Sequence, residues 1–128
     1  MAIKQRTVKI GEDEFLITSL PATKGLKILK QLTKLIGPAF SELIKGEQEG
    51  VNPVSIAMEK LFDHLDSVDV EVLIKEIISS ATKGTIAINF DSEFSGDYDR
   101  LFTLTKEIVE FNFGSVFTLL GLEPSQEQ

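Results

Sequence analysis

The segment that begins at about Tyr98 most constrains the fold, because as a helix it carries two apolar faces. At 100° per residue, one face holds Leu101, Leu104, Ile108 and Phe111. The second face, about a third of a turn away, holds Phe102, Val109, Phe113, Val116, Phe117 and Leu120. A surface helix normally buries one face, so a helix with two must lie at the centre of a domain or contact a second partner.

The end of this segment favours a partner. Gly114 and Gly121 each weaken a helix by about 1 kcal/mol relative to Ala, so the end would fray alone. Its side chains would then expose more apolar surface than most monomers tolerate. We therefore predict a partner-binding surface made of Phe111, Phe113, Val116, Phe117, Leu119 and Leu120. The alternative is that these residues belong to the core of the domain.

Two helices are predicted between residues 21 and 46. Pro21 suits a first helical turn, and an apolar stripe follows it. The stripe consists of Leu26, Leu29, Leu32, Leu35 and Ile36. Gly37 and Pro38 predict a break, after which Phe40 to Gly46 favours a short second helix.

Two more helices are predicted after an exposed loop at residues 46–52. Asn52 is a suitable N-cap, with Pro53 in the first helical position. The stripe of this helix is Val54, Met58, Leu61, Phe62 and Leu65. The next stripe is Val70, Leu73, Ile74, Ile77, Ile78 and Ala81. Gly84 is expected to end that helix.

A β-hairpin is predicted at the N-terminus, since Ile3–Ile10 and Phe15–Thr18 flank the polar turn 11–14. Two strands alone are marginally stable, so the hairpin must pack on the helices. A short additional strand is predicted near residues 85–90, with the hairpin as its expected partner and an extended continuation to Phe94 as an alternative. The expected fold is α-dominated α+β with about five helices. We expect one domain over residues 1–122 and a disordered tail at 123–128.

Charge and composition exclude several classes of function. The chain has 20 acidic and 13 basic residues, and a net charge of -7 repels nucleic acid and anionic membrane surfaces. Cysteine is absent, which excludes disulfides and thiol chemistry. No apolar run approaches the ~20 residues that span a bilayer, and the N-terminus has no signal-peptide core. A cytoplasmic location is therefore expected.

No catalytic, cofactor or metal site is predicted. His64 is the only histidine, and Asp63, Asp66 and Asp69 lie near it in the sequence. This spacing matches no metal-binding motif and favours a solvated acidic helix end. The four lysines between residues 24 and 34 favour a solvated helix face, and the glycines form no phosphate-binding pattern.

The order of these features resembles the tail assembly chaperones of long-tailed bacteriophages. The resemblance extends over roughly residues 3–121. It rests on the hairpin, on LPATKGLKILKQLTKLIGPAF at residues 20–40, and on EFNFGSVFTLLG at residues 110–121.

The resemblance implies a helper protein that is absent from the mature virion and acts in the host bacterial cytoplasm. Such a protein binds the tape measure protein, keeps this aggregation-prone helical rod soluble, and helps to recruit tail tube subunits. The resemblance also implies a longer form made by ribosomal frameshifting, and a homo-oligomer is a further expected partner state.

Two other functions fit the residues themselves. One is a structural phage tail or head-completion subunit, whose apolar segment is buried permanently by neighbouring subunits. The other is a small acidic inhibitor or decoy protein.

Overall fold

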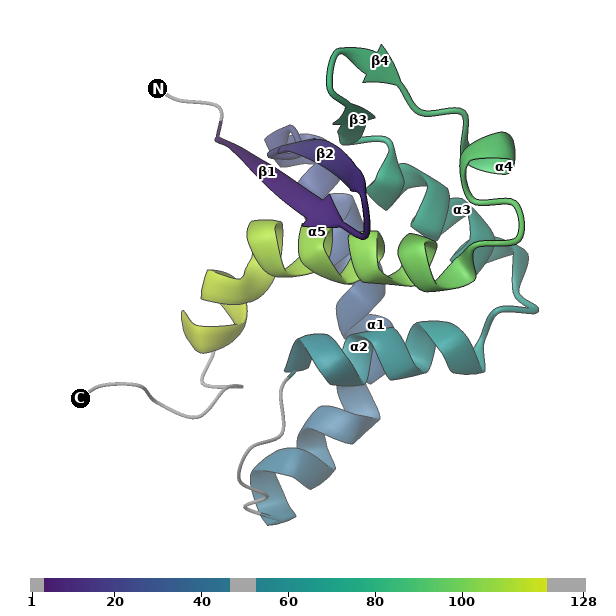
Figure 1. Ribbon diagram of the computed structural model, residues 1–128. Coiled ribbons are helices and arrows are strands. Elements are labelled where there is room, and N and C mark those ends of the chain that lie inside the picture. The colour runs from purple at the N-terminus through teal and green to yellow at the C-terminus, as the bar shows by residue number, and fades with distance from the viewer. Residues whose placement is uncertain (1–3, 47–52, 120–128) are drawn as a thin grey trace.

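In the computed structural model, a small antiparallel sheet lies at one side of a group of helices (Figure 1). The structure describes residues 4–46 and 53–119, and it describes their side chains except at 36–46, 53 and 117–119. Within these limits it contains β1 (Gln5–Ile10), β2 (Asp13–Thr18), α1 (Ala22–Gly46), α2 (Pro53–Asp63), α3 (Val68–Ile78), β3 (Ala81–Lys83), β4 (Ile86–Ala87), α4 (Phe90–Glu93) and α5 (Tyr98–Leu119). The expected fold class, α-dominated α+β with a hairpin at the N-terminus, is confirmed. The expected cap at Asn52 and the tail 123–128 lie outside the described residues.

The sheet has the strand order β1-β2-β3-β4, and every neighbouring pair is antiparallel. Its first two strands form the predicted hairpin, in which Val8 pairs with Phe15. The turn is tighter than expected, because Ile10 already pairs with Asp13 and only two residues connect the strands. Gly11 adopts a φ of +63° there, which suits a two-residue hairpin turn.

The core lies between the sheet and the helices, with α5 at its centre. Phe15 and Ile17 on β2 are fully buried, as are Leu104 and Ile108 on α5. Helix α5 contacts α2, α3 and β1, and Figure 1 shows it running beneath the hairpin. Both apolar faces of α5 thus contain buried residues, Leu104 and Ile108 on one and Val109 and Phe113 on the other, which explains why the helix can carry two of them.

Helix α1 corrects the predicted break at Gly37 and Pro38, because the helix runs through both residues to Gly46. A proline removes a single backbone hydrogen bond from a helix, and the long helical segments on either side outweigh that loss. The predicted stripe was also rotated. Ile28 and Leu32 are fully buried, whereas Leu26 is 67% exposed.

The region around Gly84 corrects a second prediction, because Gly84 does not end a helix. Helix α3 ends at Ile78, and Gly84 adopts a φ of +63° in the turn between β3 and β4. The additional strand is limited to Ile86–Ala87. It joins the hairpin through β3, since Ile17 on β2 pairs with Ala81.

Residues 90–93 form a helical turn, so the extended continuation to Phe94 is wrong. The Asn89 side-chain oxygen accepts a hydrogen bond of 3.1 Å from the backbone N–H of Ser92. This N-cap, together with two acidic residues in the first turn, favours a helix start over a strand.

Candidate functional site

The predicted partner-binding residues at the end of α5 occupy different environments. Phe113 is 5% exposed and belongs to the core, whereas Phe111 and Val116 are half-buried. The side chains of Phe117 and Leu119, and all of Leu120, lie outside the described part of the chain. Phe113 thus has a packing role in the folded domain, and partner binding by this segment stays a prediction.

Asn112, which the sequence analysis passed over, fixes the end of α5 to the rest of the fold. Its side-chain oxygen accepts a hydrogen bond of 2.9 Å from the backbone N–H of Leu20. Its amide nitrogen donates to the carbonyl oxygen of Ile108 at 3.0 Å. The segment before α1 is therefore attached to α5 by a polar side chain inside an apolar run.

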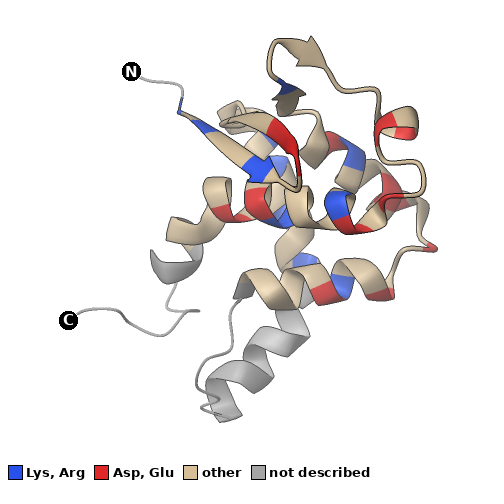
Figure 2. Ribbon diagram, in the orientation of Figure 1, with Lys and Arg blue, Asp and Glu red and all other residues tan. Residues whose placement is uncertain are grey.

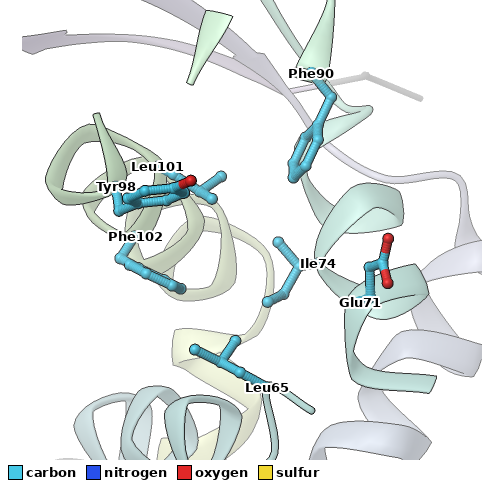
Figure 3. Close-up of a pocket in the computed structure, with 7 residues that line it drawn as sticks. All are labelled: Leu65, Glu71, Ile74, Phe90, Tyr98, Leu101 and Phe102. Atoms are coloured by element: carbon cyan, nitrogen blue, oxygen red, sulfur yellow. The ribbon is translucent and has the colours of Figure 1, made fainter. Parts of the chain in front are cut away.

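A second apolar surface lies around the first turns of α5. We call it the α3–α5 groove, a depression of about 410 Å³ that Figure 3 shows with its lining residues. The groove is lined by Leu65, Glu71, Ile74, Phe90, Tyr98, Leu101 and Phe102. Except for Glu71, its walls present apolar or aromatic side chains from α3, α4, α5 and the α2–α3 connection.

The floor and walls of the groove are held by ordinary packing. Leu101 and Ile74 are buried and join the groove to the core. The rings of Phe102 and Phe62 meet edge to face, with 4.3 Å between their centroids. Tyr98 precedes Phe102 by one helical turn, so both lie on the same side of α5. The surface is thus preformed on helices.

Exposed apolar side chains lie in the groove and on the elements that line it. Tyr98 is 62% exposed, Val68 is 71% exposed, and Phe62, Leu65 and Val72 are each close to half exposed. Val68 and Val72 are one turn apart on α3 and therefore share a face. Clusters of this kind on soluble proteins mark interaction sites more often than single exposed residues do.

Arg100 anchors the start of α5 on the side away from the groove. Its guanidinium donates hydrogen bonds to Asp97 Oδ2 at 2.8 Å, Asp13 Oδ2 at 2.9 Å and Glu93 Oε2 at 2.7 Å. It also donates to the Glu93 carbonyl oxygen at 2.6 Å and lies over the rings of Phe15 and Phe94. The hairpin turn, α4 and α5 are therefore joined at one side chain.

These ion pairs shift the pKa values of the groups involved. Hydrogen bonding from Arg100 holds the pKa of Glu93 below its ordinary value, and the pKa of Arg100 is raised in turn by Glu93. The pKa of Lys83 is raised by its hydrogen bonds to Glu93 and Asp13. All three groups are thus charged at neutral pH. Their ion pairs hold α4, which contributes Phe90 to the groove, against the sheet and α5.

We call Glu71, Asp66 and Asp99 the acidic border of the groove. Glu71 lines it directly, Asp66 follows Leu65, and Asp99 follows Tyr98. Figure 2 shows acidic residues on α3, α4, the start of α5 and the α2–α3 connection. Lys75 contacts two of the lining residues, because it pairs with Glu71 at 3.3 Å and lies over the Phe90 ring.

Within the described residues, no group of three or more His, Cys, Asp or Glu side chains could hold a metal ion. His64 is exposed, and its Nδ1 donates to the Lys60 carbonyl oxygen at 2.9 Å. The helices in the described ranges include none of the length and apolarity that a bilayer crossing requires.

Sequence reasoning missed the groove because several of its residues were assigned to apolar stripes of helices. Leu65, Ile74 and Leu101 repeat at helical spacing as core residues do, and periodicity does not distinguish a buried side chain from one that lines a groove. No local pattern in the sequence brings these residues together, since they lie on different elements.

Comparisons with known proteins give one positive result. No curated protein matches the chain, and no solved structure matches it. The family model described as phage tail assembly chaperone protein matches residues 11–123. Because that match covers most of the sequence, the chain belongs to the phage tail assembly chaperones, a non-enzymatic family.

Proposed function

We propose that this protein binds the phage tape measure protein, keeps it soluble during tail assembly and helps to bring tail tube subunits onto it. This activity takes place in the host bacterial cytoplasm, and the chaperone is absent from the mature virion. Membership of the tail assembly chaperone family supports the general role.

The observation that best supports client binding is the α3–α5 groove. A folded domain with a buried core keeps this apolar surface open, although burying it would add stability. Grooves between helices bind amphipathic helices through apolar residues spaced three and four apart. A long helical client offers such residues in every turn, and covering them prevents its aggregation.

The end of α5 is the proposed second contact. Phe111 and Val116 are half-buried, and the sequence continues with Phe117, Leu119 and Leu120. Contacts at both ends of α5 would let one chaperone cover several turns of a client helix. A homo-oligomer, or a frameshifted longer form of the chain, would supply further contacts for tube subunits.

Co-expression with the tape measure protein of the same genome tests the proposal. We expect affinity capture followed by size-exclusion chromatography with light scattering to give a soluble complex of both proteins. Insoluble tape measure protein beside a free chaperone would refute client binding.

Mass spectrometry of purified particles separates this proposal from the structural-subunit alternative. A chaperone is expected in lysates of infected cells and not in the particles. Stoichiometric recovery of the chain from particles would instead identify a tail or head-completion subunit.

A further inference from the structure

We infer that the α3–α5 groove receives an amphipathic helix whose apolar stripe is flanked by lysine or arginine residues. The inference rests on the proposed function, and it identifies the docking surface and the chemistry of the client segment.

The arrangement of the groove matches one face of a helix. Side chains from α3 and α5 form opposite walls, and Leu65 lies at one end while Phe90 lies at the other (Figure 3). The buried side chains of Ile74 and Leu101 give it an apolar floor. An incoming helix would place residues at positions i, i+3 or i+4, and i+7 between these walls.

The exposed part of the lining extends the contact. Leu65 is 47% exposed, and Tyr98 on α5 is 62% exposed. An apolar stripe seated in the groove would cover both of these side chains. Tyr98 also keeps a hydroxyl group at the edge, where such a ring contacts apolar surface and water together.

The charges at the border select the flanks of the incoming helix. Glu71 is a lining residue and is paired with Lys75, whereas Asp66 and Asp99 follow the lining residues Leu65 and Tyr98 in the sequence. Charges act over about 10 Å at 0.1 M salt. Within the described ranges, Asp66 and Asp99 have no ion-pair partner, while Arg100 is engaged with three carboxylates. Lysine or arginine residues beside the apolar stripe would meet these acids, whereas acidic flanks would be repelled.

The same charges disfavour a second copy of this chain as the occupant. In a symmetric dimer the groove would face itself, and the acidic borders would oppose each other. In a head-to-tail contact, a lysine-bearing helix face such as that of α1 would enter the groove. Among the α1 side chains that the structure describes, residues 22–35, Leu26 is the one large exposed apolar residue, which is too little for a stripe.

Two synthetic helical peptides of about 18 residues, of the kind that bind such grooves, test the inference. Both carry the same leucine stripe, one with lysine flanks and the other with glutamate flanks. Their binding to the full chain is measured by fluorescence anisotropy at two salt concentrations. We expect the lysine peptide to bind at least about ten-fold more tightly, with a difference that shrinks in high salt.

Matched variants locate the contact. Leu65→Ser with Tyr98→Ser removes two exposed lining residues, and Leu26→Ser with Ile86→Ser removes two comparably exposed residues elsewhere. We expect the first pair to weaken binding of the lysine peptide about ten-fold or more and the second pair to leave it unchanged. All four residues are at least partly exposed, so circular dichroism should show unchanged folding for both pairs.

A second set of variants tests the charge. Neutralising the border with Asp66→Asn, Glu71→Gln and Asp99→Asn should cost about two- to five-fold per carboxylate. The control replaces three exposed acids outside the groove, Glu12→Gln, Glu14→Gln and Glu110→Gln, and should change binding little.

Three results would overturn the inference. They are equal binding of both peptides, equal losses in the groove and control variants, and self-association of the chain that Leu65→Ser with Tyr98→Ser abolishes.

The tape measure co-expression separates this inference from the proposed function. If the groove variants still keep the tape measure protein soluble, the groove assignment fails alone. If the wild type does not solubilise it while the lysine peptide binds, the proposed function fails alone.

Discussion

Substitution of Phe113 tests whether this residue near the end of α5 contributes to folding or to client binding. Its side chain is 5% exposed and lies in the same core cluster as Ile108 and Val109. Truncation to alanine leaves a cavity, and Phe→Ala changes in cores cost about 3–5 kcal/mol. We therefore expect Phe113→Ala to lower the free energy of unfolding by that amount, a large share of the ~5–15 kcal/mol typical of a domain.

Urea denaturation followed by far-ultraviolet circular dichroism measures this loss. With a denaturant slope of about 2 kcal/mol per molar urea, the midpoint should fall by about 1.5–2.5 M. Ser115→Ala is the matched control, because Ser115 is exposed two residues further along the same helix. Its effect should stay within about 0.5 kcal/mol. Equal midpoints for Phe113→Ala and Ser115→Ala would refute the assignment of Phe113 to the core.

The remaining predictions concern the ion-pair cluster and two glycines. Arg100→Met should destabilise the fold by about 2–4 kcal/mol in urea denaturation, below the full cost of breaking a buried ion pair because the carboxylates are partly exposed. A loss under 1 kcal/mol (about the value of a surface ion pair) would contradict the role of Arg100. Because the pKa of Glu93 is lowered from 4.5, its contribution is present above that pH and is lost as pH falls through the lower, folded-state pKa. The thermal midpoint of unfolding should therefore decrease when the pH is lowered below about 4.5, and the decrease should be less steep in Glu93→Gln. Parallel curves for the two proteins would exclude Glu93 as a source of the pH dependence. Gly84→Ala should lower the free energy of unfolding by about 1–2 kcal/mol, because the φ of residue 84 is +63°. Gly25→Ala inside α1 should raise the free energy of unfolding by up to about 1 kcal/mol. Equal shifts of the thermal midpoint in the two variants would contradict both predictions.

Local patterns in the sequence were sufficient to predict those elements whose structure depends mainly on local interactions. The hairpin was predictable because β-branched strands flank a polar turn containing Gly11, and the structure pairs those strands. A central place for α5 was one of two interpretations of its two apolar faces, the other being contact with a partner, and the burial of Leu104, Ile108 and Phe113 supports the central place.

Elements decided by competing interactions were not predictable in the same way. A Gly-Pro pair normally ends a helix, yet α1 continues through residues 37 and 38. Gly84 could end a helix or form a turn, because a positive φ serves both, and only the pairing of β3 with β4 decides.

The candidate groove lies beyond what periodicity can show. Leu65 and Phe102 are 37 positions apart in the sequence and meet only through the packing of α2, α3 and α5. An apolar stripe predicts that a helix face is buried. It does not predict whether that face is buried by the rest of the domain or by a bound client. Phe113 illustrates this, because the same pattern that predicted a partner-binding residue is satisfied by the core.

Site-specific photo-crosslinking most directly tests the central claim that clients dock at the α3–α5 groove. A photoreactive amino acid is placed at Tyr98 in the groove, at Ile86 on β4, or at Val116 near the end of α5, in cells that also make the tape measure protein. Tyr98 is 62% exposed and Ile86 is 69% exposed, so they form a matched pair. We expect a strong crosslink to the tape measure protein from position 98 and none from position 86. Crosslinks from position 116 alone, or equal crosslinks from 98 and 86, would contradict docking at the groove.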